Sequence, residues 1–187
     1  GVCDEGTLIM KEFLVETFAH HRTLIVFLHV ISAVVWVGGM IAIRFATHQS
    51  LALISDPKLR LERAAHTLKR LFTIVLPFVI ILIVTAVLMA VGLGFRAAAM
   101  DPMGNVIDEY AMSIYNTIHI KETIWLIMAL NLGAMMWRRA KAEQALKEGN
   151  LEKAKEMLAL IAKYMVPVNI ALGVSAIYIG VVLRNAY

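Results

Sequence analysis

The chain has 187 residues, of which 60% are hydrophobic, and its mean hydropathy is +0.73. A soluble domain of this size cannot bury so large an apolar share, so the composition excludes an ordinary globular protein and indicates an integral membrane protein. The formal net charge is +4, but the cations gather in two segments between apolar stretches, which favours anionic lipid headgroups over nucleic acid as their partner.

Four predominantly apolar stretches follow one another along the chain, near residues 23–43, 71–94, 118–137 and 164–183. Each is long enough to cross a bilayer as a helix. Arginine residues close the first, third and fourth stretches, and a glycine-rich turn closes the second. We therefore expect an all-α fold, an integral membrane four-helix bundle in which residues 1–187 form a single transmembrane domain.

The segment before the first stretch is unusual. Met10 would make a natural start, so we expect Gly1–Ile9 to be an extension outside the natural chain. The first helix is too long for a signal peptide and no cleavage site follows it, so we expect it to act as its own insertion signal.

Cys3 is the only cysteine, which excludes a disulfide, a c-type haem attachment and a thiolate metal cluster.

Basic residues distinguish the two sides of the predicted membrane domain. The first and third connections are rich in Lys and Arg, whereas the second carries only Arg96 against Asp101, Asp108 and Glu109. Because positively charged loops stay in the cytoplasm, we expect a multi-pass protein of the bacterial inner membrane with both termini in the periplasm.

The two basic connections are expected to form short amphipathic cytoplasmic helices, and those of the second are expected to be solvated extensions of the third and fourth helices, with the docking of a partner as the alternative. Residues 58–70 and 138–163 mix Leu, Ala, Glu and Lys with few helix breakers, and Gly149 with Asn150 provides a hinge in the second. The external stretch 100–109 is rich in turn formers and is expected to be a loop.

Two histidines lie within the apolar stretches, where an imidazole needs a partner. An unpaired polar group in hydrocarbon costs about 2 to 7 kcal/mol, so His29 and His119 are candidate site residues. Arg44 lies 15 residues after His29 and Arg138 lies 19 after His119, so the two imidazoles differ in depth by roughly 6 Å, which helix tilt can absorb. We expect them to be the two metal ligands of one b-type haem. The alternative is that His29 bonds a neighbouring helix and His119 reaches the interface.

The remaining histidines are expected at the surface. His20 and His21 precede the first helix at the outer interface, whereas His48 and His66 lie near the inner ends of the first two helices. The alternative for the inner pair is a second haem held between His48 and His66.

One face of the first helix is expected to line the cofactor. Trp36 and Met40 lie within about 20° of His29 around the helix axis. Gly39 admits either a flat macrocycle or a close helix contact, and Trp36 can equally be core. The candidate cofactor-binding residues are Trp36, Gly39, Met40 and Arg44.

The third helix carries two charges beside its histidine, and they are the candidate catalytic residues. Glu122 lies about 60° from His119 around the axis, whereas Lys121 lies about 160° away, so one narrow face cannot present all three side chains. Charges at this depth are paired, hydrated or within reach of the interface.

Several stretches resemble a known family. The run Leu28–Met40 (LHVISAVVWVGGM) resembles the first-helix signature of CopD-type membrane proteins and, more loosely, of their HemJ-type relatives. Residues 68–73 with 86–92 are similar to the family's second helix, and residues 115–121 to the segment that brings a lysine into its third. The resemblance covers the chain from about residue 21 to 184.

The resemblance implies a four-helix inner-membrane core. In the HemJ-type branch it implies that His29 binds b-type haem and that protoporphyrinogen IX is oxidised to protoporphyrin IX. In the CopD-type branch it implies copper uptake into the cytoplasm. The stretch before Arg44 lacks the proline of the HemJ-type pattern.

Three functions remain open at this point. The first is a haem-b protein that passes electrons between a donor and an acceptor such as a quinone or a porphyrinogen; as an enzyme it would be an oxidoreductase such as protoporphyrinogen oxidase. The second is copper import, since thioether and imidazole ligands suit Cu(I). The third is a non-catalytic assembly subunit, and Gly38, Gly39 and Gly133 would serve either internal packing or a homodimer. The candidate copper donors are His20, His21, Met100, Met103 and Met112.

Overall fold

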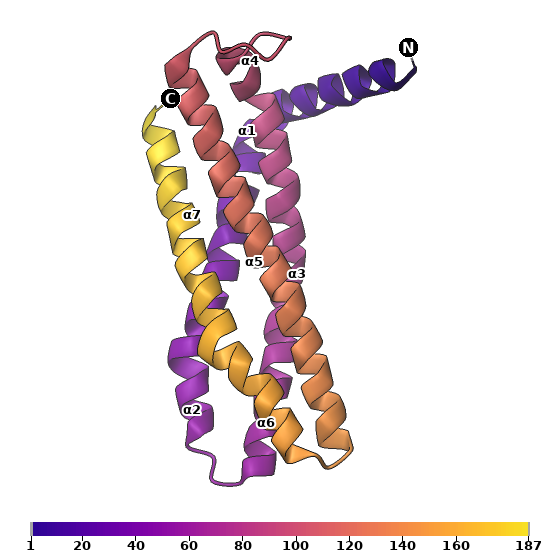
Figure 1. Cartoon of the computed structure of the whole chain (residues 1–187), viewed down its shortest axis with the longest axis vertical. Helices are drawn as coiled ribbons and strands as arrows, with labels where there is room; N and C mark the ends of the chain where they lie inside the picture. The colour runs from indigo at the N-terminus through magenta and orange to yellow at the C-terminus, as the bar shows by residue number, and fades with distance from the viewer. Residues whose placement is uncertain (1, 187) are drawn as a thin grey trace.

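Figure 1 shows the computed structural model, which describes residues 2–186 and the side chains of residues 4–186. The described chain is helical apart from short turns and an isolated β-bridge between Met100 and Val106, so the all-α prediction is confirmed. The elements are α1 (Val2–Ala42), the π-helical segment η1 (Ile43–Thr47), α2 (His48–Ala52), α3 (Pro57–Gly92), α4 (Phe95–Ala99), α5 (Glu109–Lys147), α6 (Leu151–Leu160), the π-helical segment η2 (Ile161–Met165) and α7 (Val166–Ala186).

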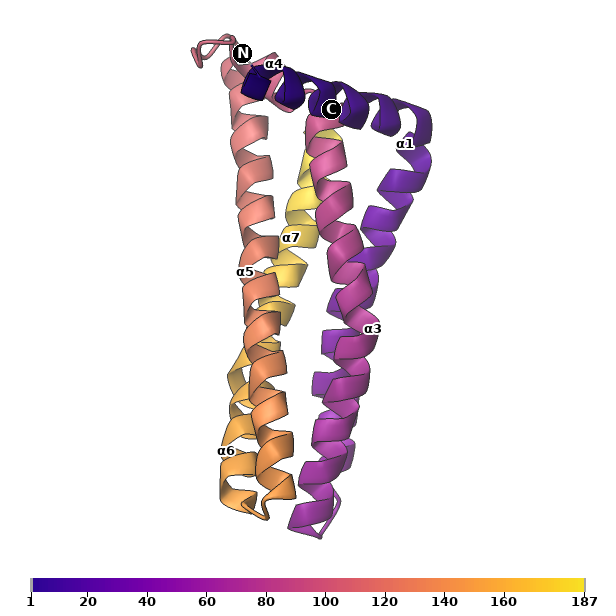
Figure 2. The ribbon, with the colours of Figure 1, turned by 90° about the vertical axis from the view of Figure 1, so that its right-hand side faces the viewer.

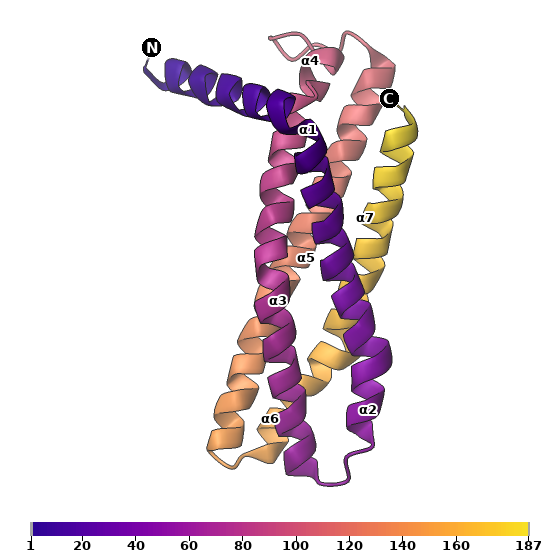
Figure 3. The same ribbon diagram turned by 180° about the vertical axis from the view of Figure 1, so that it is seen from behind.

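These elements join into four long rods that form an antiparallel bundle (Figures 1 and 2). The first rod is α1 with η1 and α2, the second is α3, the third is α5, and the fourth is α6 with η2 and α7. Neighbouring rods pack in a ring, with α1 beside α3, α3 beside α5, α5 beside α7 and α7 beside α1 (Figure 3). Both termini and α4 lie at one end of the bundle, the α4 end, and α6 lies at the other, the α6 end (Figure 1).

Side-chain caps set where the helices begin. Asp56 accepts a hydrogen bond from the Lys58 backbone N–H at 3.0 Å, and Asp108 caps α5 in the same way. Asn150 caps α6 through the Lys153 N–H, and Gly149 before it has a φ of 76°, which favours glycine. The predicted hinge at Gly149 and Asn150 is therefore confirmed, and residues 138–147 continue α5 as the predicted extension of that helix. Residues 58–70 also continue a long helix, α3, and do not form a separate short helix.

The first helix differs most from its prediction. Helix α1 begins well before residue 23, and its backbone bends at His21, where φ is −126° and ψ is 25°. Residues 2–20 therefore form an arm that leaves the bundle sideways at the α4 end (Figure 1). Phe18 anchors the arm, because its buried ring lies where a side chain at Gly92 of α3 would be.

Large apolar side chains are exposed on the outer faces of all four rods. A soluble protein rarely exposes so much contiguous apolar surface. Three runs are long and apolar enough to cross a membrane, namely Asp4–Ala52, Pro57–Ala99 and Leu151–Ala186. The run of α5 is not among them, since Lys121, Glu122 and Asn131 interrupt the stretch 118–137. Residues more than half exposed include Val30, Val34, Ile80, Leu126, Leu130 and Val174.

A polar pair joins α5 to α7 inside the apolar bundle. The Asn131 side-chain amide donates to Asn169 Oδ1 at 2.8 Å and to the Met165 carbonyl at 2.9 Å. Asn169 is fully buried and donates to the Met128 carbonyl at 3.3 Å. Because these groups find no other partner in an apolar interior, the pair fixes the register of the two helices.

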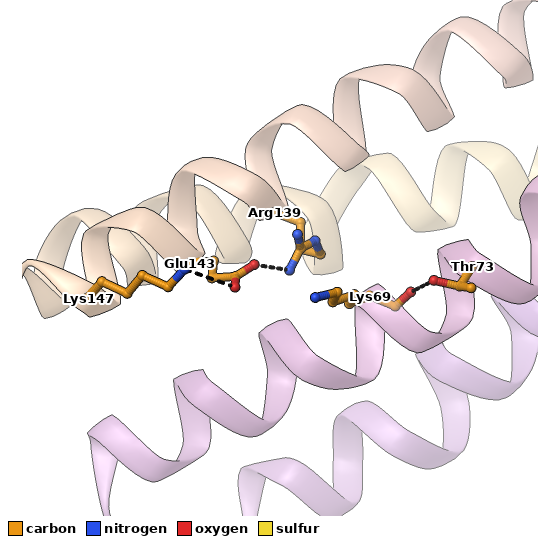
Figure 4. Close-up of polar contacts among 5 residues, drawn as sticks. All are labelled: Lys69, Thr73, Arg139, Glu143 and Lys147. Atoms are coloured by element: carbon orange, nitrogen blue, oxygen red, sulfur yellow. Dashed lines mark hydrogen bonds and ion pairs between the residues drawn. The ribbon is translucent and has the colours of Figure 1, made fainter.

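An ion-pair network lies on α5 near the α6 end (Figure 4). Arg139 Nη1 donates to Glu143 Oε2 at 2.8 Å, and Lys147 Nζ lies 3.5 Å from Glu143 Oε1. The hydrogen bond from Arg139 holds the pKa of the Glu143 carboxyl below its ordinary value, and the charges of Arg139 and Lys147 act in the same direction.

The lowered pKa of Glu143 predicts how this network responds to pH. A depressed carboxyl pKa contributes stability above the ordinary value near 4.3 and loses it as the pH falls through the folded pKa. The Arg139→Gln variant should raise the pKa of Glu143 towards that ordinary value and cost about 0.3 to 0.5 kcal/mol at neutral pH, as measured by carboxyl NMR titration and thermal unfolding. Lys69→Gln on the facing helix α3 (Figure 4) is the control and should leave the Glu143 pKa unchanged. An unaltered pKa in Arg139→Gln would contradict the prediction.

Candidate functional site

His29 is buried in the bundle near the α4 end, and Thr85 of α3 orients its ring. The side chain is 6% exposed, and Nδ1 lies 3.0 Å from Thr85 Oγ1. The Thr85 hydroxyl donates its single proton to the Ile81 carbonyl at 2.7 Å or the Leu82 carbonyl at 3.0 Å. It therefore accepts from His29 Nδ1–H, and Nε2 is left with its lone pair. A fixed Nδ1–H is the usual arrangement of a histidine that binds a metal.

His29 lines a small cavity of about 40 Å³, here called the His29 cavity, between α1, α3, α5 and α7. Its polar lining includes Lys121 and Glu122 of α5, so two of the predicted residues meet His29 in one place. Lys121 is partly buried, and its Nζ lies 3.7 Å from the position of a Cβ on Gly180 of α7. The other lining residues are Ala86, Met89, Ala90, Leu93, Phe95, Ile118, Trp125 and Leu183.

Two stacked indole rings adjoin the His29 cavity, and one of them, that of Trp125, lines it. Trp36 of α1 and Trp125 of α5 stack with their ring centroids 5.6 Å apart, and both are buried. Their Nε1–H groups are the buried side-chain polar atoms that find no hydrogen-bond acceptor in the described part of the chain. Unpaired buried donors are costly and rare. The two indole N–H groups are therefore able to donate hydrogen bonds to an acceptor atom of a bound group.

The structure does not bring His119 to His29. The His119 side chain is 52% exposed and its Nδ1 lies 3.5 Å from Glu122 Oε2, while its ring meets Tyr115 edge-on at 4.3 Å. It lines an open groove of about 980 Å³, the His119 groove, which adjoins the His29 cavity beneath the N-terminal arm. The predicted pair of facing imidazoles is therefore not found in this arrangement, because α5 turns Lys121 inward and His119 outward.

Other predicted residues have packing roles or lie elsewhere. A Cβ on Gly39 would lie 3.1 Å from Leu71 Cδ1 and 3.5 Å from Val75 Cγ2, so this glycine serves the contact between α1 and α3. Met40 is fully buried core. Arg44 and His48 line a pocket at the α6 end, whereas His66 lines a different groove between α3 and α5, so His48 and His66 do not face one cavity.

Three of the candidate copper donors have their own local surroundings in the structure. Met103 is 88% exposed, and Met100 pairs through its backbone with Val106 in the loop before α5. His20 pairs with Glu16 at 3.8 Å. Among the described side chains, no group of three or more His, Cys, Asp or Glu residues could hold a metal ion.

The fit of a b-type haem to these residues is mixed. The imidazole of His29 suits one axial bond to iron, because its Nδ1–H is fixed and its Nε2 keeps a lone pair. The His29 cavity, however, has the volume of about one or two water molecules. A porphyrin would enter only if lining side chains such as Met89 and Phe95 moved apart.

Two important residues of the site were missed at the sequence level. Thr85 is the single hydrogen-bonding side chain between Pro77 and Arg96. A lone hydroxyl in an apolar helix indicates a hydrogen bond to a neighbouring helix, and this signal could have identified Thr85. Trp125 gave no such signal, since an indole in an apolar stretch is ordinary.

Comparison of the chain with protein-family models, with curated proteins and with solved structures gave no match. The geometry of the chain defines an all-α antiparallel bundle with a buried histidine oriented by a threonine.

Proposed function

We propose that the chain is a multi-pass membrane protein whose four rods all cross the bilayer, with both termini on the periplasmic side of a bacterial inner membrane. The support is the exposed apolar surface on every rod, which includes Leu126 and Leu130 of α5. The cations of the first and third connections lie at the α6 end, which the positive-inside rule places in the cytoplasm. Helix α5 can cross the bilayer although it carries polar side chains, because each of them has a place inside the bundle. Lys121 and Glu122 line the His29 cavity, and Asn131 is hydrogen-bonded to Asn169.

Membrane-impermeant labelling of single cysteines tests this orientation. In a Cys3→Ser background, a cysteine at Asn105 in the loop at the α4 end should be labelled from the periplasm in intact cells. A cysteine at Asn150 at the α6 end should be labelled only after permeabilisation. The reversed pattern would refute the orientation, and recovery of the protein in the soluble fraction would refute the membrane placement.

We further propose that one b-type haem binds at His29, in the His29 cavity widened by movement of its lining side chains, and that the protein is a membrane redox protein of the CopD and HemJ type. The observation that carries this proposal is the hydrogen bond from His29 Nδ1–H to Thr85, because it leaves Nε2 as a ligand atom in a buried site. A bound haem would supply one-electron transfer between a donor and an acceptor such as a quinone or a porphyrinogen. The unpaired indole donors of Trp36 and Trp125 agree with a ligand that carries oxygen acceptors.

The charged residues of α5 have separate roles in this proposal. Lys121 lines the His29 cavity and provides a positive charge there, while Glu122 borders both the cavity and the His119 groove. These two spaces also share Ala90, Phe95 and Ile118. A partner molecule in the groove would therefore approach the buried site past Glu122.

A visible spectrum of the purified protein tests the haem proposal directly. The expected result is a Soret band that shifts on reduction with dithionite, with an iron-to-protein ratio near one. A colourless protein purified from haem-replete cells would remove the proposal, and a ratio of two would favour a second haem.

Two substitutions on α5 should separate the residues that the structure places apart. Lys121→Gln should lower the haem reduction potential by tens of millivolts, on the order of 1 kcal/mol, because a half-buried cation favours the reduced form. His119→Ala should leave both the spectrum and the potential unchanged, since its side chain lies in the outer groove. Potentiometric titration checks both variants. A changed Soret band and lost haem in His119→Ala would instead show that His119 is an iron ligand.

A further inference from the structure

The α6 end of the bundle contains a second cavity that has no part in the proposed haem site. It measures about 240 Å³ and is called here the Arg44 pocket. Its walls come from η1 and α2, from the first turns of α3, and from α6 with η2. Arg44, Arg60 and Lys155 carry charge at the pocket, while Leu61, Leu158 and Ile161 form part of its apolar lining.

Two local changes of helix geometry meet at this pocket. Segments η1 (Ile43–Thr47) and η2 (Ile161–Met165) are both π-helical, and each contributes side chains to the lining. Neither segment contains proline or glycine. Pro167, however, lies two residues after η2 and cannot donate a hydrogen bond to the Lys163 carbonyl, so a helix breaker accounts for the widened turn of η2 but not for that of η1. Short π-helical turns inside α-helices are rare and occur frequently at functional sites, and here two of them border one cavity from different rods.

The charge of the pocket is unbalanced. No Asp or Glu is among its lining residues. The ion pairs of the described side chains involve other cations, such as Lys58, Arg139 and Lys147. Arg60 is held in place because its Nε donates to the Ile54 carbonyl at 2.8 Å, and Arg44 is only partly exposed. Three cations therefore surround an apolar cavity without a carboxylate to neutralise them.

We infer that the Arg44 pocket binds one anionic phospholipid of the inner leaflet, with the headgroup phosphate held by Arg44, Arg60 and Lys155 and an acyl chain against the apolar lining. Charge complementarity favours an anion, and the apolar walls favour a hydrocarbon chain over a free phosphate. Basic pockets between helices on the cytoplasmic side are the usual form of such sites. The inference rests on the proposed membrane placement, which puts the α6 end at the cytoplasmic surface, but it does not depend on haem.

Native mass spectrometry of the full chain in a neutral detergent tests the inference. Dioleoyl phosphatidylglycerol and dioleoyl phosphatidylcholine are added separately, so the probes differ in headgroup charge while their chains are the same. The expected result is one phosphatidylglycerol adduct that persists at collision energies that remove phosphatidylcholine. Glycerol phosphate in excess should not displace it.

The test variant is Arg44→Gln with Lys155→Gln, which spares Arg60 because that side chain also holds the turn before α3. Its affinity for phosphatidylglycerol should fall by about 10- to 30-fold. The matched control is Arg63→Gln with Lys153→Gln, exposed cations on the same connections and outside the pocket, and it should stay within about twofold of the wild type. Circular dichroism confirms that both variants are folded.

Three outcomes would overturn the inference. They are equal retention of the two lipids, an equal loss in the test and control variants, and displacement by glycerol phosphate, which would indicate a soluble anion. A wild-type protein recovered from the soluble fraction would overturn the membrane placement as well. A colourless protein with intact lipid selectivity would overturn only the haem proposal.

Discussion

Replacement of His29 by alanine is expected to leave the purified protein without haem, with the Soret band reduced by about tenfold or more. His29 is the histidine that lines the small cavity, and the imidazole of His119 lies in the adjoining His119 groove. No other side chain at this depth of α1 provides a ring nitrogen. Absorbance per mole of protein in haem-replete membranes measures the effect.

Thr85→Val is the second variant of this experiment, because it removes the acceptor of His29 Nδ1–H while keeping the shape of the side chain. Haem affinity should fall by about 10- to 100-fold, the usual effect of losing the group that orients a metal-binding histidine. His48→Ala, which alters a histidine at the α6 end, should keep full haem content. Full occupancy in a folded His29→Ala protein would end the haem proposal, and equal losses in His29→Ala and His48→Ala would assign them to general instability.

Replacement of Gly173 by alanine is expected to destabilise the bundle by about 1 to 3 kcal/mol, the range for overpacking a close helix contact. A Cβ at Gly173 of α7 would lie 2.6 Å from Val37 Cγ2 and 3.1 Å from Met128 Cε. Val37 is β-branched and buried, so its side chain cannot easily turn away. The added methyl group should therefore push α7 away from α1 and α5.

Gly133→Ala is the matched control on α5. A Cβ there would meet nothing within 4 Å, so the substitution should be neutral or stabilise the helix by up to about 1 kcal/mol. Thermal unfolding followed by circular dichroism in one detergent compares the two variants. Equal stability of Gly173→Ala and the wild type would show that the contact of α7 with Val37 is looser than the structure indicates.

The sequence predicted the helices better than it predicted their rotation. The length of the apolar stretches predicted where all four rods lie along the chain, because a run of about 20 mostly apolar residues is a strong signal for a long helix. The angular argument on α5 also correctly predicted that His119 and Lys121 point to different sides. It could not say which of them faces inward, since the positions around one helix fix only relative directions. That choice depends on contacts with α7, such as the position of Lys121 beside Gly180.

Other features had weak or no local signals. The bend at His21 and the π-helical segment η1 contain no proline or glycine, so nothing in the local sequence marks them. Segment η2 did have a local signal, because Pro167 follows it and removes the hydrogen bond to the Lys163 carbonyl. In the arm of residues 2–20, Phe18 makes a long-range contact with Gly92 of α3. Such a contact arises from tertiary packing, and the helical periodicity of apolar residues, 3.6 residues per turn, does not predict it.

The buried pair of Asn131 and Asn169 has a consequence for the synthesis of the protein. Helix α5 is the least apolar of the four rods, and its amide at Asn131 finds its partner 38 residues further along the chain. At about 5 to 20 residues per second, translation leaves that amide unpartnered for roughly 2 to 8 s. On the proposed membrane placement, α5 has a weak preference for lipid during this interval, so it should enter the bilayer most favourably together with α7, as a hairpin. Helix α7 would therefore determine when α5, which carries Lys121, becomes stable in the proposed membrane.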